Sequence, residues 1–318
     1  MKSLVVALFA ILPLAAQAPK QAAGKADDKA PAVQDQAPIR LDVTRVSLLF
    51  TVQDKKGRFI TDLGKDEFEV TENKKLQTIL GFNTESNLPL RLAVLLDTSS
   101  SIKERFKFQQ EAATEFVDTV VRRGVDKALV VSFDSLAELA TDLTDDPDKL
   151  GRAIQNQRPG GGTAFYDAIG MACDKLIRPD EPREDFRRAV VILSDGFDNA
   201  SRLTREQALE FAQKADAVIY TISTNISGVE TDGDKVLRYF SQETGGQTYF
   251  PFKAQDLAQS FENIANELRH QYDVFYRPEP LKADGQYHTV VVKLKNRKDL
   301  TVRARRGYYA PLQAELGK

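Results

Sequence analysis

Apolar residues in the middle of the chain, from about residue 90 to 270, form short unbroken runs separated by segments with helical periodicity. Unbroken runs of this length predict strands buried on both faces. The last helical segment places Leu257, Phe261, Ile264 and Leu268 on one face, because they are spaced four, three and four residues apart. Alternation of strands and helices is typical of a doubly wound, mostly parallel sheet with helices on both faces. The runs that predict strands are 92–96, 128–133, 189–194, 217–223 and 248–252, and residues 136–144 predict a short hairpin strand at a sheet edge.

The two flanks of this region have the period of two that predicts strands with one buried face. Residues 39–86 contain an alternating pattern from Val46 to Val52 and a hairpin pattern whose turn lies at Glu72 to Lys75. Residues 271–310 contain further alternating runs. Neither flank has enough strands for a stable sheet of its own. We therefore expect the flanks to pair into one small β-sandwich, with an α/β domain at 88–270 inserted between its halves.

The two ends of the chain have the composition of segments outside the fold. Residues 1–18 begin with Lys2, continue with a short apolar run and end in small residues, which predicts a secretory signal peptide. The apolar run is short for a membrane span, although a retained N-terminal anchor is an alternative. Residues 19–38 are rich in Ala, Lys, Asp, Gln and Pro and predict a disordered linker. Residues 311–318 are a predicted tail, and we expect a secreted or periplasmic protein.

Composition narrows the possible chemistry. The chain has 318 residues, a formal net charge of −2 and a hydrophobic content of 42%, so no positive excess points to nucleic acid. Cys173 is the single cysteine and is expected to be a small buried side chain. The two histidines are too few for a histidine-based zinc site and lack the pattern of a Ser-His-Asp triad. On the last alternating run, Arg303, Arg305 and Arg306 predict a charged face turned to solvent.

Candidate metal ligands follow the first apolar run of the central region. Asp97, Ser99 and Ser101 are spaced two residues apart, so in an extended segment they share one side. Carboxylate and hydroxyl oxygens are hard ligands that suit Mg²⁺, Mn²⁺ or Ca²⁺. Thr163 lies on a glycine-rich loop before a predicted helix, and Asp195 ends a second buried run. Ligands bind parallel sheets at these carboxyl ends of strands.

These three segments together resemble the von Willebrand factor type A domain and its metal-ion-dependent adhesion site. The family pattern of Asp-x-Ser-x-Ser, then Thr, then Asp-Gly matches Asp97, Ser99, Ser101, Thr163 and Asp195. The resemblance implies the strand order 3-2-1-4-5-6 and one divalent cation, Mg²⁺ first, with Mn²⁺ or Ca²⁺ as alternatives. It also implies that the serines touch the ion, that the threonine touches it in the ligand-ready state, and that the aspartates often act through water. An Asp or Glu of a partner protein then fills an open coordination position.

The flanks carry a second, looser resemblance. A Val-x-Asp-x-x-Gly turn at Val52 to Gly57 and an Arg-x-Gly-Tyr-Tyr ending at Arg305 to Tyr309 are similar to a family of secreted bacterial proteins related to the type A domain. With both resemblances, nearly the whole mature chain is covered.

Each motif also has a purely structural explanation. Asp97 to Ser101 could cap a helix, the glycine run could be a flexible loop, and Asp195-Gly196 could be a turn. Asp167 is expected to be a first-turn acid, and Phe165, Tyr166 and Phe197 could form an apolar collar around the site or lie in the core. Asp198 and Asn199 could support the ligands or simply form a solvated turn.

Two other functions remain as alternatives to a metal-dependent binding module. The segment around Asp97 resembles the Asp-Thr-Ser loop of aspartic proteases, and Asp195 would then have to share a proton with it. The alternation of strand and helix argues against that almost all-β class, and Ser-Asp-Gly does not repeat the first loop. A structural domain with a vestigial metal site is the other alternative. The sequence favours a secreted adhesion or scaffold protein without enzymatic activity and leaves its oligomeric state open.

Overall fold

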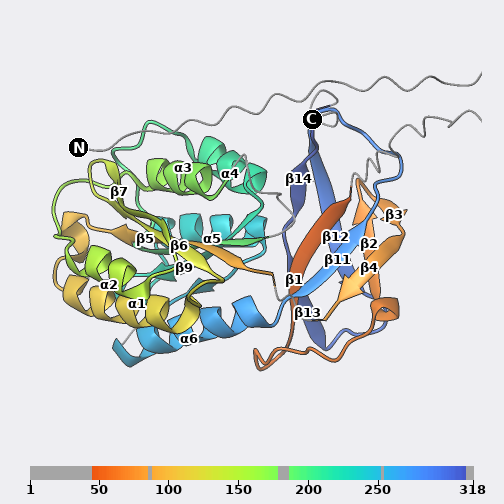
Figure 1. Ribbon diagram of the computed structural model, residues 1–318, viewed down its shortest axis with the longest axis horizontal. Coiled ribbons are helices and arrows are strands. Elements are labelled where there is room, and N and C mark those ends of the chain that lie inside the picture. Colours follow the sequence, from red (N-terminus) through yellow and green to blue (C-terminus); the bar gives the residue numbers. More distant parts are fainter. Residues whose placement is uncertain (1–44, 85–87, 178–185, 252–253, 313–318) are drawn as a thin grey trace, which may run out of the picture. The chain divides into compact units, whose positions relative to one another are not determined.

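The computed structural model describes residues 45–84, 88–177, 186–251 and 254–312 (Figure 1). The predicted signal peptide at 1–18 and linker at 19–38 lie outside the described residues. Within the described ranges, no helix is long and apolar enough to cross a membrane.

The central region is built on a six-stranded sheet with the order β10-β9-β8-β5-β6-β7. Numbered along the central region alone, this is the order 3-2-1-4-5-6 read from one edge to the other, as the resemblance implied. Five strands run parallel, whereas β7 pairs antiparallel with β6 at the edge, as predicted for residues 136–144. The strands are β5 (Leu90–Asp97), β6 (Lys127–Phe133), β7 (Ala137–Thr144), β8 (Arg187–Ser194), β9 (Ala217–Ser223) and β10 (Thr248–Tyr249).

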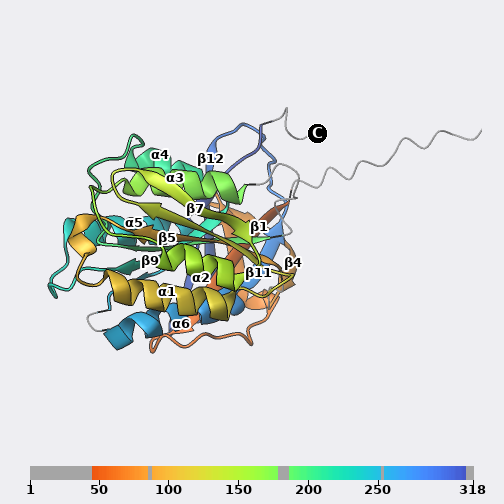
Figure 2. The same cartoon turned by 60° about the vertical axis from the view of Figure 1, so that its left-hand side comes forward.

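Helices cover both faces of this sheet (Figure 2). Alternate residues of β5 enter opposite cores: Leu92 and Val94 pack with one set of helices, and Ala93 and Leu95 with the other. Every residue of β5 and β8 is buried, which explains their unbroken apolar runs. One face carries α1 (Phe106–Val120), α2 (Pro147–Gln155) and α6 (Ala254–Arg269), and the other carries α3 (Phe165–Leu176), α4 (Arg205–Lys214) and α5 (Asp232–Thr244).

Side chains from the predicted helical faces lie in these cores. Leu257, Phe261, Ile264 and Leu268 of α6 are all buried, as predicted. Cys173 of α3 is also buried, and burial raises the pKa of its thiol to about 12. The predicted last strand is shorter than its apolar run, because β10 ends at Tyr249, before Pro251.

The flanking segments combine into a β-sandwich. Its two four-stranded sheets have the orders β13-β1-β11-β4 and β14-β12-β2-β3, so each sheet contains strands from both flanks. Both sheets contribute to one apolar core. The elements are β1 (Val46–Asp54), the short 3₁₀ helix η1 (Lys65–Glu67), β2 (Phe68–Glu72), β3 (Lys75–Gln77), β4 (Ile79–Asn83), β11 (Tyr272–Tyr276), β12 (Tyr287–Leu294), β13 (Leu300–Ala304) and β14 (Gly307–Tyr309).

The predicted fold class is therefore confirmed: a doubly wound, mostly parallel sheet accompanied by a small β-sandwich. The hairpin turn also lies where it was expected, because Glu72 pairs with Lys75 across Asn73 and Lys74, which both have positive φ. The residue limits assigned to the separate domains remain predictions.

A buried polar cluster lies inside the sandwich. The carboxylate of Glu72 accepts hydrogen bonds from Tyr276 Oη at 2.7 Å and Tyr308 Oη at 3.1 Å. Its other oxygen lies 2.7 Å from His288 Nδ1, whereas His288 Nε2 lies 3.2 Å from Asp284 Oδ1. Burial, together with the neighbouring Glu72 carboxylate, raises the pKa of both tyrosines, which keeps them as proton donors. The cluster is a closed network that joins β2, β11, β12 and β14.

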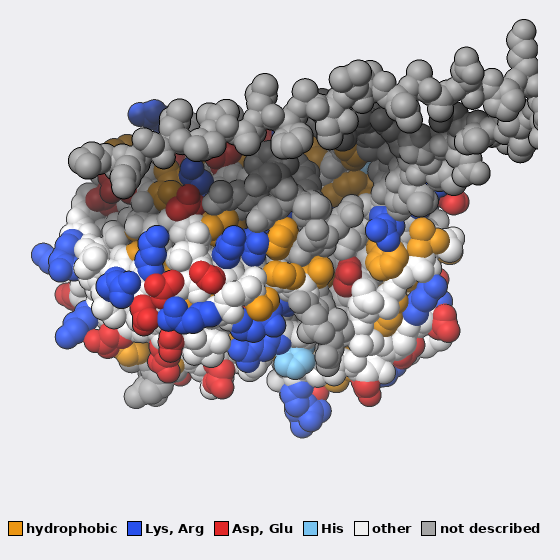
Figure 3. All heavy atoms as spheres, in the orientation of Figure 1, with side chains coloured by type: hydrophobic (Ala, Val, Ile, Leu, Met, Phe, Trp, Pro, Cys, Tyr) orange, Lys and Arg blue, Asp and Glu red, His pale blue; other side chains and the backbone are white. Residues whose placement is uncertain are grey.

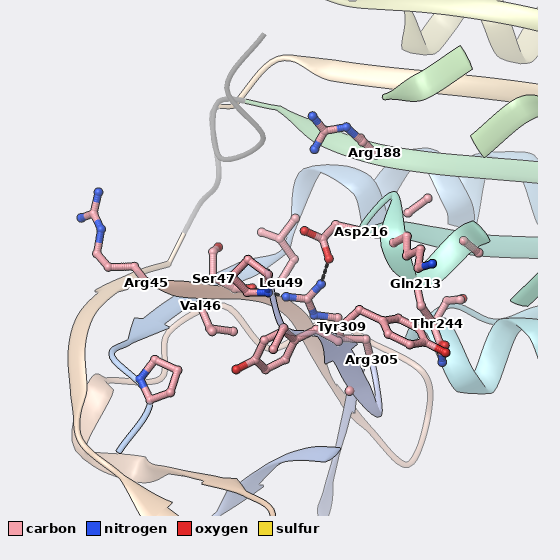
Figure 4. Close-up of a pocket in the computed structure, with 18 of the residues that line it drawn as sticks. Arg45, Val46, Ser47, Leu49, Arg188, Gln213, Asp216, Thr244, Arg305 and Tyr309 are labelled. Atoms are coloured by element: carbon pink, nitrogen blue, oxygen red, sulfur yellow. Dashed lines mark hydrogen bonds and ion pairs between the residues drawn. The ribbon is translucent and has the colours of Figure 1, made fainter. Parts of the chain in front are cut away.

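The prediction of a solvated arginine face is wrong for two of the three arginines. Arg303 donates to Glu267 Oε2 of α6 at 2.6 Å, and the Glu267 side chain is fully buried. Arg305 pairs with Asp216 and donates to Ser47 O at 2.7 Å, so it joins β1 to the turn before β9 (Figure 4). Arg303 and Arg305 therefore form ion pairs between the sandwich and the central region, with residues that are distant in the sequence. Arg306, paired with Glu243, is exposed as expected.

Candidate metal centre

The candidate ligands meet where strands β5 and β8 end. These neighbouring strands run parallel, with Leu96 paired to Leu193. Asp97 is the last residue of β5, and Asp195 immediately follows β8. The chain leaves β5 toward β6 on one side and enters β8 on the other, so this edge is the point where strand order reverses. Open α/β sheets bind ligands at such a point.

Two serine hydroxyls and one carboxylate form a connected set of oxygens. Ser99 Oγ lies 3.0 Å from Ser101 Oγ. Ser101 Oγ in turn donates to Asp195 Oδ2 at 2.9 Å. Ser99 is buried and Ser101 is exposed, so the set runs from the interior to the surface. The structure thus brings the first and third sequence motifs together at one place.

Asp97 lies behind this set. Its Oδ1 accepts the backbone N–H of Ser99 at 2.9 Å, and its Oδ2 accepts Ser194 Oγ at 2.6 Å. Burial raises the pKa of Asp97 to about 6, and the negative Asp195 adds to this, although the bonds from Ser194 and Ser99 act in the opposite direction. Removing a carboxylate from water costs free energy that a nearby positive charge can offset.

The glycine-rich loop that carries Thr163 is held against both other loops. Gly160 N donates to Thr98 O at 2.7 Å, on the β5 side. Thr163 N donates to Asn199 Oδ1 at 2.8 Å, on the β8 side. A Cβ at Gly162 would lie 2.7 Å from Asn199 Oδ1, so a side chain there does not fit. The glycine run therefore permits close packing, which is a different role from that of a flexible loop.

The side chain of Thr163 is the remaining candidate ligand. Thr163 is buried, and its hydroxyl has no hydrogen-bond partner among the residues that the structure describes. Within the described residues, the Thr163 hydroxyl is hydrogen-bonded to neither Ser99 nor Ser101. The structure therefore holds the Thr163 backbone between the other two loops, and the role of its hydroxyl in metal binding remains a prediction.

This donor set fits a hard divalent cation. Mg²⁺ takes oxygen ligands at about 2.1 Å in an octahedron, so two neighbouring ligands lie about 3 Å apart. The separations of 3.0 Å and 2.9 Å along Ser99, Ser101 and Asp195 have this size. Across the described ranges no group of three or more His, Cys, Asp or Glu side chains could hold a metal, so a bound ion here depends on the hydroxyls.

Some residues around the site escaped the sequence prediction. Ser194 supports Asp97 and also accepts Gly196 N at 3.0 Å; its only signal is a hydroxyl at the end of an apolar run. Ser135 accepts Gly162 N at 2.8 Å from the loop after β6, and nothing in its local sequence marks it. Asn199 accepts a hydrogen bond from the backbone of Thr163, which agrees with its predicted role as a support for the candidate ligands.

Other residues near the motifs have structural roles. Asp198 Oδ1 accepts the N–H of Phe165 at 2.9 Å, so it caps the start of α3. Asp167 accepts the N–H of Leu203 at 2.9 Å and anchors the loop before α4, a role beyond that of a first-turn acid. Phe165 lies in the core, whereas Phe197 is 48% exposed at the rim of the site.

The comparison with known families agrees with this geometry. The family model described as "von Willebrand factor type A domain" matches residues 92–197, which run from β5 to just past Asp195. The chain contains a von Willebrand factor type A domain. The matched segment includes all five candidate ligands.

Three individual proteins are similar to this chain. An uncharacterized protein of Borreliella burgdorferi is 23% identical over 217 residues, which cover 57% of this chain and 61% of that protein. The structure of "von Willebrand factor type A" from Catenulispora acidiphila matches with a TM-score of 0.50 and 13% identity, over 86% of this chain and 76% of that one. The vWF domain of the type V pili tip protein Mfa5 from Porphyromonas gingivalis matches with a TM-score of 0.45 and 14% identity, over 57% and 95%. At 13% identity, the likeness to the Catenulispora structure supports the fold alone.

Proposed function

We propose that this protein is a secreted, non-enzymatic adhesion or scaffold module whose type A domain binds a partner protein through a divalent cation. Mg²⁺ is the preferred candidate for this ion, with Mn²⁺ and Ca²⁺ as alternatives, and the partner supplies an Asp or Glu. The observation that carries the proposal is the linked set of Ser99, Ser101 and Asp195 oxygens at the open edge of the sheet.

The chemistry of the ligands explains why a partner carboxylate is needed. Ser99 and Ser101 offer neutral hydroxyls, and Asp97 is already engaged with Ser194 and Ser99. Direct protein ligands therefore neutralise only part of a divalent charge. The bound cation would supply a positive charge and an open coordination position at the surface. The N-terminus of α3, which begins at Phe165, adds a favourable field for an incoming acid.

Other features support binding over hydrolysis and over nucleic-acid contact. Hydrogen bonds join Asp97 to Ser194 and Asp195 to Ser101, and no bond between the two carboxylates is found in the described part of the chain, unlike a proton-sharing dyad. His288 contacts Glu72 inside the sandwich, so it is not positioned to act as a catalytic base for Asp97 or Asp195. Figure 3 shows basic and acidic side chains interspersed over the visible face. A nucleic-acid-binding surface would instead carry a continuous basic patch or stripe.

The test of the metal site is calorimetric titration of metal-stripped protein with Mg²⁺, Mn²⁺ and Ca²⁺. We expect saturable binding of one ion that is lost in Ser101→Ala. Ser100→Ala is the matched control, because its hydroxyl donates to Gly161 O at 3.1 Å and is outside the proposed ligand set. Equal binding by both variants would contradict the assignment, and absence of binding in the wild type would favour a structural domain with a vestigial site.

The test of the activity uses partner capture and a protease assay. Partner retention from the secreted or envelope fraction should require Mg²⁺ and disappear in chelator. Peptide cleavage at acid pH that is abolished by Asp97→Asn would instead restore the aspartic-protease alternative.

A further inference from the structure

A cleft adjoins the candidate metal centre on the side of the loop between β9 and α5. It has a volume of about 230 Å³, and Ser101 and Asp195 contribute to its wall together with Arg105, Phe197, Thr224 and Ile226. Phe197 is 48% exposed and Ile226 is 55% exposed. The cleft therefore combines the oxygens of the metal centre with apolar surface that nothing in the described chain covers.

The loop at residues 224–231 holds apolar side chains outward by tying its polar groups inward. Asn225 Nδ2 donates to Val229 O at 2.8 Å and to Asp234 Oδ2 at 2.6 Å. Ser227 N donates to Asn225 Oδ1 at 2.9 Å, which closes the loop on itself. Val229, at the loop's far side, is 70% exposed. The loop thus presents two aliphatic side chains on a backbone that is already ordered, which lowers the entropy lost on binding.

A close backbone contact joins this loop to the other side of the cleft. A Cβ at Gly196, which has φ +78, would lie 2.2 Å from Gly233 O, and a Cβ at Gly233 would lie 2.1 Å from Asp195 O. The start of α5 is therefore packed directly against the backbone that carries Asp195 and Phe197. As a result, the apolar rim and the proposed metal ligand form one rigid surface.

Two polar groups in the wall have no partner among the described residues. Thr224 Oγ1 is shielded from solvent and makes no hydrogen bond with the residues that the structure describes. Arg105 is half-buried, and no described residue forms a hydrogen bond or an ion pair with its guanidinium group. A free cation beside the metal position complements an acidic ligand, and the hydroxyl can meet a polar group of the ligand's backbone.

We infer that this cleft is the docking site for a protein segment in which a large apolar side chain lies near the metal-binding Asp or Glu. The inference rests on the proposed function, because the carboxylate reaches the cation while the apolar side chain contacts Phe197 and Ile226, which line the cleft. Burying one such side chain strengthens binding by roughly tenfold. The occupant is thus a mixed acidic and apolar segment, and a purely acidic surface is insufficient.

The experiment uses the full mature chain and short Gly/Ser peptides with a central Glu. In one set, Leu replaces each residue near the Glu in turn, and in the matched set Asn takes the place of Leu. Binding in Mg²⁺ is followed by fluorescence anisotropy. We expect Leu, in at least one position, to improve the affinity about tenfold over Asn. The gain should disappear in Ile226→Ser, which changes a residue of the cleft wall, and persist in the control Leu80→Ser, whose side chain is exposed on the sandwich.

Four results would overturn the inference, and three of them are separable from the proposed function. Equal affinity of Leu and Asn peptides at every position, or a gain that survives in Ile226→Ser, would remove the apolar contact while leaving the metal site intact. The same holds if no peptide binds although calorimetry shows Mg²⁺ binding. Absence of Mg²⁺ binding itself would overturn the proposed function and the inference together.

Discussion

The molecule contains two clusters of carboxylate and hydroxyl oxygens, one in the sandwich and one at the edge of the parallel sheet. In the sandwich, Glu72 accepts from two tyrosines and contacts His288, and its side chain is 4% exposed. At the sheet edge, Asp97 and Asp195 lie near each other, and burial raises the pKa of Asp97. Both clusters have hydrogen-bond donors, but the second brings two carboxylates near each other and opens to solvent.

We interpret this difference as one between a structural role and the proposed binding role. Buried polar groups stabilise a fold when each has a partner, and they are costly when one is missing. The network of Glu72 meets that condition with protein groups alone. At the edge cluster we propose that a cation offsets the remaining negative charge, so the same residue types would serve packing in one region and recognition in the other. Four experiments test this comparison.

The largest effect is expected from ending the chain after residue 270. β1 and β2 would lose their partners β11 and β12. We expect residues 46–80 to lose their protection in hydrogen exchange. The central sheet, whose strands pair among themselves, should stay folded. Persisting protection at 46–80 would show that the N-terminal flank folds independently, and the sandwich would not be one unit.

Glu72→Ala should destabilise the sandwich while leaving the metal centre intact. The change leaves Tyr276, Tyr308 and His288 without their shared acceptor. Loss of one member of a buried charged network costs about 3–5 kcal/mol in free energy of unfolding. Denaturant titration measures this cost, and Mg²⁺ affinity of the folded variant should match the wild type. Glu69→Ala, on the same strand, is the control and should change stability by about 0.5 kcal/mol or less.

Asp97→Ala should have the opposite effect to Glu72→Ala: it should weaken Mg²⁺ binding and leave the free energy of unfolding largely unchanged. We expect Mg²⁺ affinity to fall about a hundredfold or more, equivalent to about 3 kcal/mol. In chelator, the free energy of unfolding should change by less than about 2 kcal/mol, because relief from burying a carboxylate offsets two lost hydrogen bonds. Calorimetry and denaturant titration measure the two quantities, with Glu138→Ala on exposed strand β7 as the charge-matched control. A variant that unfolds without losing Mg²⁺ affinity would reverse the comparison.

Thr163→Ala should have the smallest effect on the isolated protein. Its backbone, held by Asn199, is unchanged by the substitution, so the fold should keep its Tm. Mg²⁺ affinity should fall by about tenfold or less, because one neutral ligand is lost. Partner binding should collapse in Thr163→Ala and survive in Thr163→Ser, which a surface-binding assay in Mg²⁺ measures. Full partner binding by Thr163→Ala would assign the threonine to packing alone.

Local patterns in the sequence predicted the framework well. The unbroken runs of β5 and β8 indicated strands buried on both faces, and both end at the same edge of the sheet. The spacing of Asp97, Ser99 and Ser101 predicted a shared side in an extended segment. The two hydroxyls do lie 3.0 Å apart, but a short 3₁₀ helix at Ser100–Ile102 brings them there. These features depend on neighbours in the sequence, so periodicity and spacing could predict them.

Contacts between distant segments could not be predicted in this way. Ser194 supports Asp97 across two strands, and Ser135 supports the glycine loop from a different turn. Arg303 alternates like a solvent-facing residue, yet it finds the buried Glu267 in another part of the chain. A local pattern records whether a side chain is polar and leaves open which distant group it meets.

The sandwich has a consequence for the order in which the protein can fold. Its first strand bonds with a partner far along the chain: Ser47 Oγ donates to Asp273 Oδ1 across a separation of 226 residues. While the ribosome extends the chain, the type A domain can complete its sheet before the last strands exist. Closure of the sandwich is then a slow, late step, because pairing across a long loop carries the largest entropic cost. A chain released before its final strands would expose unpaired edges to proteases and to other chains.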